Sequence, residues 1–372
     1  MVQLLDTGIK NVRNVPEYII GEGSLSSLSD MLRKRREDED GPVWFFVDEF
    51  FKEKSDLVDL LPTLHTDHVD YVSTNKEPTT KYINALLGRM SAASHKTPCA
   101  IVGLGGGITL DTAKAISNLV TNGGQAEDYQ GWDLLRLRGV HKIGIPTLSG
   151  TGAEATRTCV LTNEATGLKL GMNSHFTVFD QLILDPSLTR TVPRSQYFFT
   201  GMDAYIHSFE ALAGSYRNAI GDALSFQAIK LAREVFADEN MQHDNNREKI
   251  MVASYLGGSA IATSYVGLVH PFSAGLSVVF GIHHCKANCV AMKGMEDYYP
   301  GEYSDFMRLV AKQSIDLGEL TNNIGSLDSI THDQLYKATI IHEKPLINAL
   351  GEGFKEQLDR RTVRKIFEKI LQ

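Results

Sequence analysis

Residues 100–114 read AIVGLGGGITLDTAK, and this stretch decides the fold of the N-terminal half. A short apolar run ends in three consecutive glycines at 105–107, and a segment with helical periodicity begins near Thr109. Glycines between a strand and a helix allow backbone N–H groups at the helix N-terminus to approach a phosphate closely. The pattern therefore predicts a strand–turn–helix unit that can bind a phosphorylated ligand, although a plain tight turn would show the same pattern.

Three further β-rich runs lie in the same half of the chain, with helical segments between them. They cover residues 43–48 (VWFFVD), 141–148 (HKIGIPTL) and 182–186 (LILDP). Strands that alternate with helices form a parallel, doubly wound sheet, which binds its ligands at the carboxyl ends of the strands. We therefore predict an α/β, Rossmann-like dinucleotide-binding domain over residues 1–189.

Beyond residue 189 the strand runs disappear and long helical patterns replace them. In residues 220–236, for example, apolar side chains recur at spacings of three and four. The other helical patterns cover residues 204–213, 247–262, 302–317 and 361–371. We predict an all-α domain over residues 190–372, and 372 residues are a suitable length for two domains.

Composition limits the possible partners and location of the chain. The net charge of −8 comes from 37 basic and 45 acidic residues, so neither nucleic acid nor an anionic membrane surface is an expected partner. The first fifteen residues lack the pattern of an export signal, and four cysteines at unrelated spacings are expected to be free thiols. The charge run at 33–40 (RKRREDED) is expected to be a solvated helix end. A cytoplasmic protein is expected.

The most apolar stretch of the chain covers residues 265–282. It contains His270 and Pro271, and it is too short and too polar to cross a membrane. We predict a buried helix there.

Two further features could complete a dinucleotide site. Residues 147–152 (TLSGTG) follow a predicted strand and combine hydroxyl groups with glycine, so two such loops could hold the two ends of a dinucleotide. Asp48 ends the first strand, where a carboxylate can accept both ribose hydroxyls and repel a 2′-phosphate, which favours NAD over NADP. A surface carboxylate is an equally good interpretation of Asp48.

One aspartate and three histidines are candidate metal ligands. Asp203 and His207 are four residues apart, so on a helix they share one face at about 6 Å. His270 and His284 are fourteen residues apart, and one straight helix would separate them by about 20 Å. The two histidines can share an ion only if the chain breaks between them.

Pro271, Gly275 and Gly281 are the candidate positions for that break. Imidazole and carboxylate ligands suit zinc, iron and other transition metals, and such a metal can act as a Lewis acid toward an alcohol. Unrelated histidines are the plain alternative. A rival zinc knot, His283-His284-Cys285-x-x-x-Cys289, lacks a second Cys/His pair at finger-like spacing.

Four patterns occur in order along the chain, and together they are specific. They read Gly105-Gly106-Gly107-x-x-x-Asp111-x-x-Lys114, Pro146-Thr147-x-x-Gly150-Thr151-Gly152-x-Glu154, Asp185-Pro186-x-Leu188 and Gly201-Met202-Asp203-Ala204-x-x-His207. In order and spacing they resemble the iron-type (group III) alcohol dehydrogenases, and His270 and His284 keep that family's interval between its last two ligands. The resemblance covers about residues 10–300.

The resemblance implies an N-terminal α/β NAD-binding domain, a C-terminal helical metal domain and a homodimer. It implies one divalent transition metal, zinc or iron, on Asp203, His207, His270 and His284. For NAD it implies Asp48 at the adenosine ribose and Gly106 and Gly107 at the pyrophosphate, with Ile108 and Asp111 beside it. On the nicotinamide side it implies Thr147, Thr151, Thr156, Thr158, Lys169 and Leu188.

The activity that the resemblance implies is the oxidation of a small-molecule primary alcohol to an aldehyde, with NAD as hydride acceptor. Similarity over the whole chain further implies a sugar acid, 3-deoxy-manno-octulosonate (Kdo), oxidised at C8 on a route to an aminated lipopolysaccharide sugar. An anionic substrate needs a cationic partner, for which Arg157, Arg194 and Lys293 are candidates.

Two positions depart from the family pattern. Ala274 stands where many members have a histidine that is often assigned to proton relay, so the proton has to leave by another group or by water. Ile108 replaces a common serine after the glycines and removes one hydroxyl donor. Backbone contacts to the cofactor remain, and the two departures are compatible with tight retention of NAD or with another final electron acceptor.

Two other functions remain open at this point. A dehydroquinate-synthase-like cyclase would use NAD only transiently, and it needs several basic residues, of which residues 260–290 offer only Lys286. A non-catalytic protein that senses NAD or a sugar acid is the second alternative.

Overall fold

The computed structural model describes residues 12–322, 324–325 and 327–372. Residues 1–11, which include most of the N-terminal segment without an export-signal pattern, lie outside the described residues. Two compact units can be recognised, and each is described by itself. One contains Val12–Leu148 and Gly152–Thr191, and the other contains Ser149–Thr151 and Val192–Gln372. The short segment Ser149–Thr151 therefore belongs to the second unit, although it lies within the α/β part of the sequence.

The first unit is built on a parallel six-stranded sheet with the order β1-β9-β6-β4-β2-β3. Its strands are β1 (Glu17–Ile20), β2 (Val43–Asp48), β3 (His68–Val72), β4 (Ala100–Gly105), β6 (Lys142–Pro146) and β9 (Gln181–Leu184). The predicted doubly wound α/β domain is thus confirmed. The four predicted strands are β2, β4, β6 and β9, while β1 and β3 at the edges of the sheet were not predicted.

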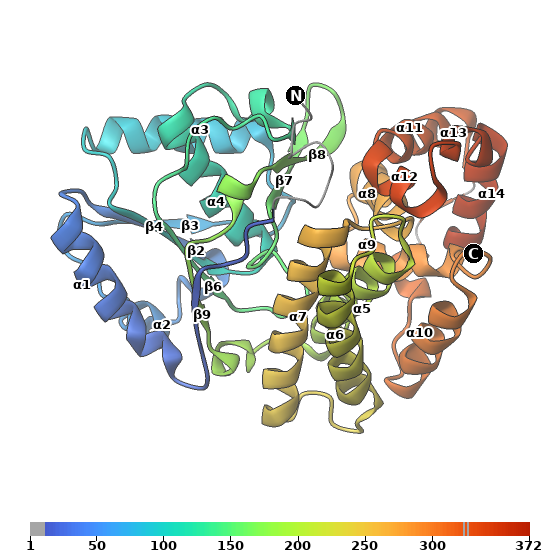
Figure 1. Cartoon of the computed structure of the whole chain (residues 1–372), viewed down its shortest axis with the longest axis horizontal. Coiled ribbons are helices and arrows are strands. Elements are labelled where there is room, and N and C mark those ends of the chain that lie inside the picture. The colour runs from blue at the N-terminus through green and yellow to red at the C-terminus, as the bar shows by residue number, and fades with distance from the viewer. Residues whose placement is uncertain (1–11, 323, 326) are drawn as a thin grey trace. The chain divides into compact units, whose positions relative to one another are not determined.

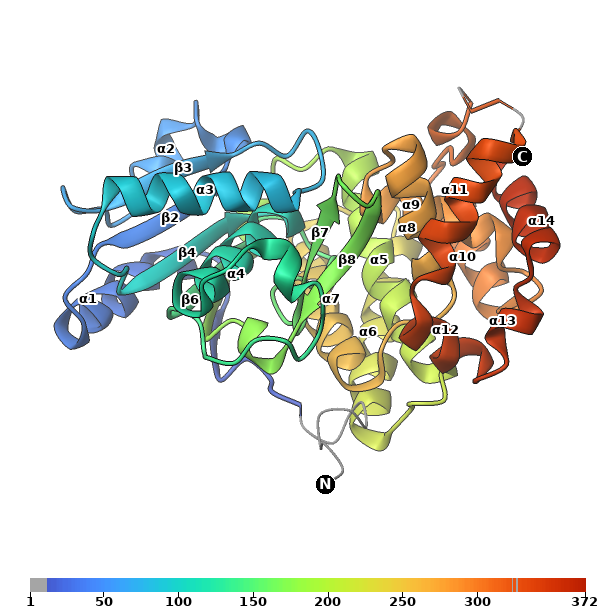
Figure 2. The same cartoon turned by 90° about the horizontal axis from the view of Figure 1, so that it is seen from above.

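Alternating side chains of the central strands supply two hydrophobic cores, one on each face of the sheet. Trp44 and Phe46 pack with α3 (Thr80–Ala93) and α4 (Gly107–Asn122), whereas Phe45 and Val47 pack with α1 (Leu28–Asp38). Figures 1 and 2 show α3 and α4 on the opposite side of the strands from α1. A strand that is covered on both faces is apolar along its whole length, which explains the uninterrupted run VWFFV.

A small second sheet in the same unit was not predicted from the sequence. It has the order β5-β8-β7, with β5 (Gly131–Trp132), β7 (Thr158–Asn163) and β8 (Leu168–Asn173). β7 and β8 are antiparallel, and Thr162 lies opposite Lys169. The remaining short helices of the unit are η1 (Ser24–Ser27), η2 (Glu49–Phe51), α2 (Ser55–Val58), η3 (Ala126–Tyr129), η4 (His175–Thr177) and η5 (Pro186–Thr189).

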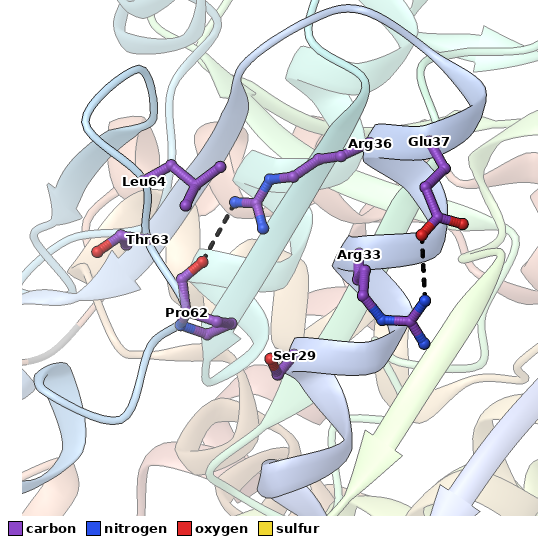
Figure 3. A pocket seen from close by; sticks show the side chains of 7 residues that line it. All are labelled: Ser29, Arg33, Arg36, Glu37, Pro62, Thr63 and Leu64. Carbon is purple, nitrogen blue, oxygen red and sulfur yellow. Dashed lines mark hydrogen bonds and ion pairs between the residues drawn. The ribbon is translucent and has the colours of Figure 1, made fainter.

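A surface hollow of the first unit lies between α1 and the segment around Pro62 (Figure 3). Its two arginines are both engaged by neighbours. Arg33 binds Glu37 at 3.1 Å, and Arg36 binds the Pro62 carbonyl at 3.2 Å and the Asp67 carboxylate. Because these positive charges are already paired, the hollow does not offer an anion site. The charge run at 33–40 is the predicted end of a helix, since α1 ends at Asp38.

The second unit is helical in all its described elements, as predicted. Its long helices are α5 (Arg194–Ala213), α6 (Ala219–Ala237), α7 (Asp244–Ser264), α8 (Val269–Phe280), α10 (Pro300–Lys312), α11 (Ser329–Ile340) and α14 (Arg360–Leu371). Shorter ones are α9 (His284–Ala291), η6 (Met292–Gly294), η7 (Gly318–Leu320), α12 (Glu343–Leu350) and α13 (Phe354–Gln357). One continuous apolar core, with buried aromatic side chains such as Phe198, Phe272 and Phe367, joins these helices.

The predicted buried helix at 265–282 is α8, which carries buried side chains through most of its length. Among the described residues, no single helix is both long and apolar enough for a membrane span. Taken together, α7 and α8 have sufficient length and apolar composition, but they meet at a bend of 106°. The four cysteines are buried and form no disulfide, as expected.

Candidate metal centre

The helix α5 presents three buried polar side chains on one face. Asp203, His207 and Glu210 follow one another at spacings of four and three, so their side chains emerge on the same side of the helix. At most 3% of the surface of each side chain is exposed. Burial of this kind requires partners, because an unpaired polar group costs free energy in an apolar core.

The break that brings His270 and His284 together lies at Gly281. This residue ends α8 in the left-handed region, with φ +69° and ψ 20°, and its N–H donates to the carbonyl of Ser277 at 3.0 Å. α9 then begins at His284, and the His270 and His284 ring centroids are 5.4 Å apart. One of the three candidate breaks is therefore confirmed.

The other two candidate breaks were wrong. Pro271 is the third residue of α8, and in the first turn of a helix its missing N–H costs no intrahelical hydrogen bond. Gly275 lies inside α8 against α11, where an added Cβ would come within 2.9 Å of the Thr339 hydroxyl. Gly275 therefore serves close packing of two helices and does not interrupt one.

The four predicted metal ligands converge in the second unit. One donor atom from each of Asp203, His207, His270 and His284 can be chosen so that all four lie within 4.8 Å of one another. The Nε2 atoms of His207 and His270 are each 3.7 Å from Oδ1 of Asp203, and Nε2 of His284 is 3.7 Å from Oδ2. Three imidazoles and one carboxylate form a donor set that suits a transition metal.

The rival zinc knot does not form. Of its members, only His284 belongs to a group of side chains that could hold an ion among the described residues. Cys285 points its Sγ at Oδ2 of Asp203, 3.3 Å away, and Cys289 points toward the carbonyl of Phe199 at 3.8 Å. The two thiols thus contact different parts of α5.

Glu210 is a functional side chain that the sequence reasoning missed. Its Oε2 accepts a short hydrogen bond from Nδ1 of His270, and its Oε1 accepts from the backbone N–H of Val269 at 2.6 Å. A carboxylate on Nδ1 fixes the tautomer of the imidazole, so that Nε2 carries the lone pair that a metal needs. The signal was available, since Glu210 follows His207 by three residues on the same helix.

Electrostatic interactions in the cluster favour a negative Asp203. Burial alone would raise the pKa of Asp203, but the surrounding imidazoles of His207, His284 and His270 outweigh it and lower the pKa well below its usual range. Burial lowers the pKa of His207 to about 4, so this imidazole is neutral near pH 7. A neutral imidazole beside an anionic carboxylate is the protonation state in which both can coordinate a cation.

Replacing Glu210 by glutamine is expected to weaken metal binding by about 10- to 100-fold, the usual cost of losing an outer partner of a metal-bound histidine. A glutamine has one side-chain oxygen, so it can accept from either His270 Nδ1–H or the Val269 N–H, and its own NH₂ group then faces the other donor. Competition with a chelator measures the affinity. Glu234→Gln, at an exposed pair with Lys249, is the control. An E210Q protein that binds metal as tightly as the unaltered chain would refute the role of Glu210.

The predicted cofactor residues of the first unit mark the carboxyl ends of three neighbouring strands. Asp48 ends β2, the glycine turn follows β4, and Thr147 follows β6 with its N–H on the Gly105 carbonyl at 3.0 Å. Gly106 is the N-cap of α4, and no side chain caps this helix. An added Cβ at Gly106 would approach Leu148 to 2.7 Å. Gly107 and Ile108 form the first turn of α4, whose N–H groups suit an anion.

Asp48 lies beside this turn. Its carboxylate accepts hydrogen bonds from the Phe50 N–H at 3.0 Å and the Thr74 hydroxyl at 3.4 Å. Burial raises its pKa, which those hydrogen bonds partly oppose. Because only 8% of Asp48 is exposed, it is not a plain surface carboxylate, and its role at the adenosine ribose stays a prediction.

Asp111 and Lys114 attach α4 to the small sheet. Asp111 accepts a hydrogen bond from the backbone N–H of Val160 at 2.9 Å. The Lys114 ammonium is buried and donates to the carbonyls of Thr156 and Thr158 at 3.0 and 2.9 Å. Asp111 and Lys114 therefore have a structural role in the glycine motif, because they hold the segment that carries Thr156 and Thr158.

The last three predicted cofactor residues are Lys169, Leu188 and Thr151. Lys169, on β8, forms an ion pair with Glu77 at 3.2 Å and lies near enough to Asp111 to help lower its pKa, which burial raises to about 6. Leu188 lies in η5 after β9. Thr151 belongs to the second unit.

Comparisons with known proteins agree on one family. Residues 16–186 match the family described as iron-containing alcohol dehydrogenase, and residues 198–327 match the C-terminal part of the Fe-containing alcohol dehydrogenase family. Together these two matches span most of the chain.

Individual relatives carry related names. Sulfoacetaldehyde reductase of Bilophila wadsworthia (strain 3_1_6) is 37% identical over 188 residues, 50% of this chain and 48% of that protein. NAD-dependent methanol dehydrogenase of Bacillus methanolicus is 35% identical over 195 residues, 52% and 51% of the two chains. These matches thus span about half the length of each relative. A sulfoacetaldehyde reductase structure from Bifidobacterium kashiwanohense in complex with NAD⁺ has a TM-score of 0.80, at 20% identity over 97% of this chain and 98% of that one.

Proposed function

Because the chain belongs to the iron-containing alcohol dehydrogenase family, we propose that it oxidises a primary alcohol to an aldehyde with NAD as hydride acceptor. The observation that carries this proposal is the convergence of Asp203, His207, His270 and His284 in one buried group. We propose that these four side chains hold one divalent transition metal, zinc or iron. When bound there, the metal supplies Lewis acidity toward the alcohol oxygen.

The side chains of the second unit have distinct tasks in this proposal. Asp203 supplies the negative charge of the donor set, and the three imidazoles supply nitrogen donors. Glu210 holds the imidazole of His270 in the tautomer that leaves Nε2 available. The nearly complete burial of Asp203 and His207 excludes water from their side of the site.

The first unit supplies the proposed NAD site. The uncapped N-terminus of α4, at Gly106 and Gly107, offers N–H groups and the positive end of the helix dipole to the pyrophosphate. Asp48 is placed to accept the ribose hydroxyls of the adenosine, which favours NAD over NADP. The proposed division of function is dinucleotide binding in residues 1–189 and metal binding with catalysis in residues 190–372.

The path of the substrate proton differs from the family pattern. Ala274 lies four residues after His270 on α8 and has no titratable group. We propose that the proton leaves through water or through the ribose hydroxyls of the cofactor. Ile108 has no hydroxyl to offer the phosphates, so their binding depends on backbone N–H groups.

For the substrate we propose a sugar acid, with C8 of 3-deoxy-manno-octulosonate as the reacting alcohol, for an aminated lipopolysaccharide sugar. Of the three candidate cations, Arg157 is buried on Asp133, and Arg194 donates to the carbonyl and side chain of Gln313 at 2.8 and 2.7 Å. Lys293 is the remaining candidate, and burial lowers the pKa of its ammonium. A homodimer in the cytoplasm completes the proposal.

Removal of the metal is expected to abolish the activity. Protein treated with a chelator should form no NADH from NAD and Kdo or a simple primary alcohol, and Zn²⁺ or Fe²⁺ should restore the reaction. NADH absorbance measures the rate. Full turnover by metal-free protein would contradict a metal-dependent mechanism. Metal-replete protein that changes its substrate without net NADH would favour the cyclase, and binding without any reaction would favour a sensor.

A further inference from the structure

The two carboxylate oxygens of Asp203 both receive hydrogen bonds from α9. The Nδ2 group of Asn288 donates to Oδ1 at 2.6 Å, and the Sγ of Cys285 donates to Oδ2 at 3.3 Å. The side chains of Asp203 and Asn288 are fully buried, and that of Cys285 is 7% exposed. Water therefore has little access to these contacts, and α9 fixes both ends of one carboxylate on α5.

The orientation of the Asn288 amide follows from its neighbours. Its Nδ2 lies 3.2 Å from Nε2 of both His270 and His284. An ionised carboxylate oxygen can only accept, so the end of the amide that lies 2.6 Å from Oδ1 of Asp203 is the NH₂ group. Turned the other way, the amide oxygen would face a carboxylate oxygen. The NH₂ end therefore faces the four candidate ligands.

The other end of the same amide is buried without a partner among the described residues. An unpaired amide oxygen in an apolar core costs free energy, of the order that removal of a buried hydrogen bond costs. Asn288 thus leaves its amide oxygen without a hydrogen bond while its NH₂ group donates to Asp203. A leucine of similar branched shape would avoid that cost, so packing alone does not account for an asparagine here.

A carboxylate that is held at one atom still rotates about its terminal bond, because that torsion has a broad energy minimum. Donors at both oxygens remove this freedom. We propose that Asn288 and Cys285 are positioning residues, which orient the Asp203 carboxylate toward the three imidazoles and so set the affinity of the metal site. The inference rests on the proposed function, because it takes the four converging side chains as a metal site.

The position of the two donors on α9 links this orientation to the fourth ligand. His284, Cys285 and Asn288 lie within five residues of the same helix, with His284 and Asn288 one turn apart. A movement of α9 would therefore shift an imidazole and the carboxylate together. α9 thus connects His284 to Asp203, although the two residues are 81 positions apart in the sequence.

Metal affinity, measured by competition with a chelator, tests the role of Asn288. Asn288→Leu keeps the branched shape of the side chain and removes the donor, and its affinity for Zn²⁺ is expected to fall by about 10- to 100-fold. The visible spectrum of the Co²⁺-loaded protein is expected to change, because a reoriented carboxylate alters the ligand field. Asn288→Ala is measured alongside and serves where leucine prevents folding, which circular dichroism checks.

The two buried thiols of α9 form a matched pair for the test of Cys285. Cys285→Ala is expected to lower the affinity by about threefold, since a thiol is a weak donor. Cys289→Ala removes a buried thiol one turn away that contacts no Asp203 oxygen, and it should bind metal unchanged. Cys285→Ser keeps a donor and should retain the affinity better than Cys285→Ala.

The possible outcomes separate this inference from the proposed function. An unaltered chain that binds no Zn²⁺ or Co²⁺ would overturn the metal site and the inference with it. An unaltered chain that binds metal, beside a folded N288L protein with equal affinity and an unchanged Co²⁺ spectrum, would overturn the inference alone. Equal losses in Cys285→Ala and Cys289→Ala would overturn the part assigned to Cys285.

Discussion

Replacing Asp203 by asparagine is expected to reduce metal affinity by more than about a hundredfold, beyond the usual cost of losing an outer partner, and to abolish alcohol oxidation. Asp203 is the one anionic donor among the four, and the imidazoles around it keep its pKa low. An asparagine of the same shape is neutral and a poor ligand. Its NH₂ group cannot accept a hydrogen bond, so it would face the donor of either Asn288 or Cys285 without forming one. Metal content after dialysis and NADH formation measure the two effects.

Asp333→Asn is the control for this prediction. Asp333 is a partly exposed carboxylate on α11, paired with Lys337 and Arg360, so it tests the removal of one negative charge away from the site. Its metal content and activity should equal those of the unaltered chain. A D203N protein that keeps one metal ion per chain and its activity would show that Asp203 is not a ligand.

Replacing Gly150 by alanine is expected to lower the free energy of unfolding by about 3–5 kcal/mol, at the upper end of single substitutions. Gly150 has φ +136°, which a side chain rarely tolerates, and an added Cβ would overlap the backbone carbonyl of Thr200. Backbone of the helix α5 cannot move aside as a side chain would. The same substitution should weaken metal binding, because Thr200 lies one turn before Asp203.

Thermal and denaturant unfolding measure this effect, and Gly351→Ala is the matched control. Gly351 also has a positive φ, +80°, but an added Cβ meets no atom within 4 Å. Its loss of stability is therefore expected to be limited to backbone strain, about 1–3 kcal/mol. If the two alanine variants were equally stable, the close approach of Gly150 to α5 would not affect the free energy of unfolding.

The central strands of the sheet could be predicted because their environment is uniform. β2, β4, β6 and β9 are covered on both faces, or nearly so, and they therefore read as apolar runs. The edge strands β1 and β3 are partly exposed and too short for a clear pattern. In β7, buried and partly buried side chains alternate at first, and the turn to β8 carries Gly167 with φ +66°, a signal that could have been used.

The metal site was predictable in part from spacing. A spacing of four residues places Asp203 and His207 on one face of a helix, and this inference needs no knowledge of the tertiary structure. His270 and His284 needed a break, and the sequence offered three candidates without a means of choosing. Gly281 is the break because it adopts the left-handed conformation that ends α8. Pro271 is tolerated in the first turn of α8, and Gly275 allows α8 to pack closely against α11.

The outer partners of the site lay beyond the sequence reasoning for a different reason. Glu210 and Asn288 are polar residues on helices that already had assigned ligands, and each lies one turn from a ligand histidine. Asking which other polar residues share the ligand face would have found both. Cys285 could not be found in this way, because its contact with Asp203 depends on how α9 packs on α5.

The central claim is that one transition metal binds between Asp203, His207, His270 and His284, and anomalous X-ray scattering from crystals of the Zn²⁺-loaded chain tests it most directly. We predict one anomalous peak per chain at the zinc absorption edge, about 2.0–2.2 Å from one oxygen of Asp203 and from the Nε2 atoms of the three histidines. A zinc peak elsewhere in the chain, or no peak between these four side chains, would contradict the claim.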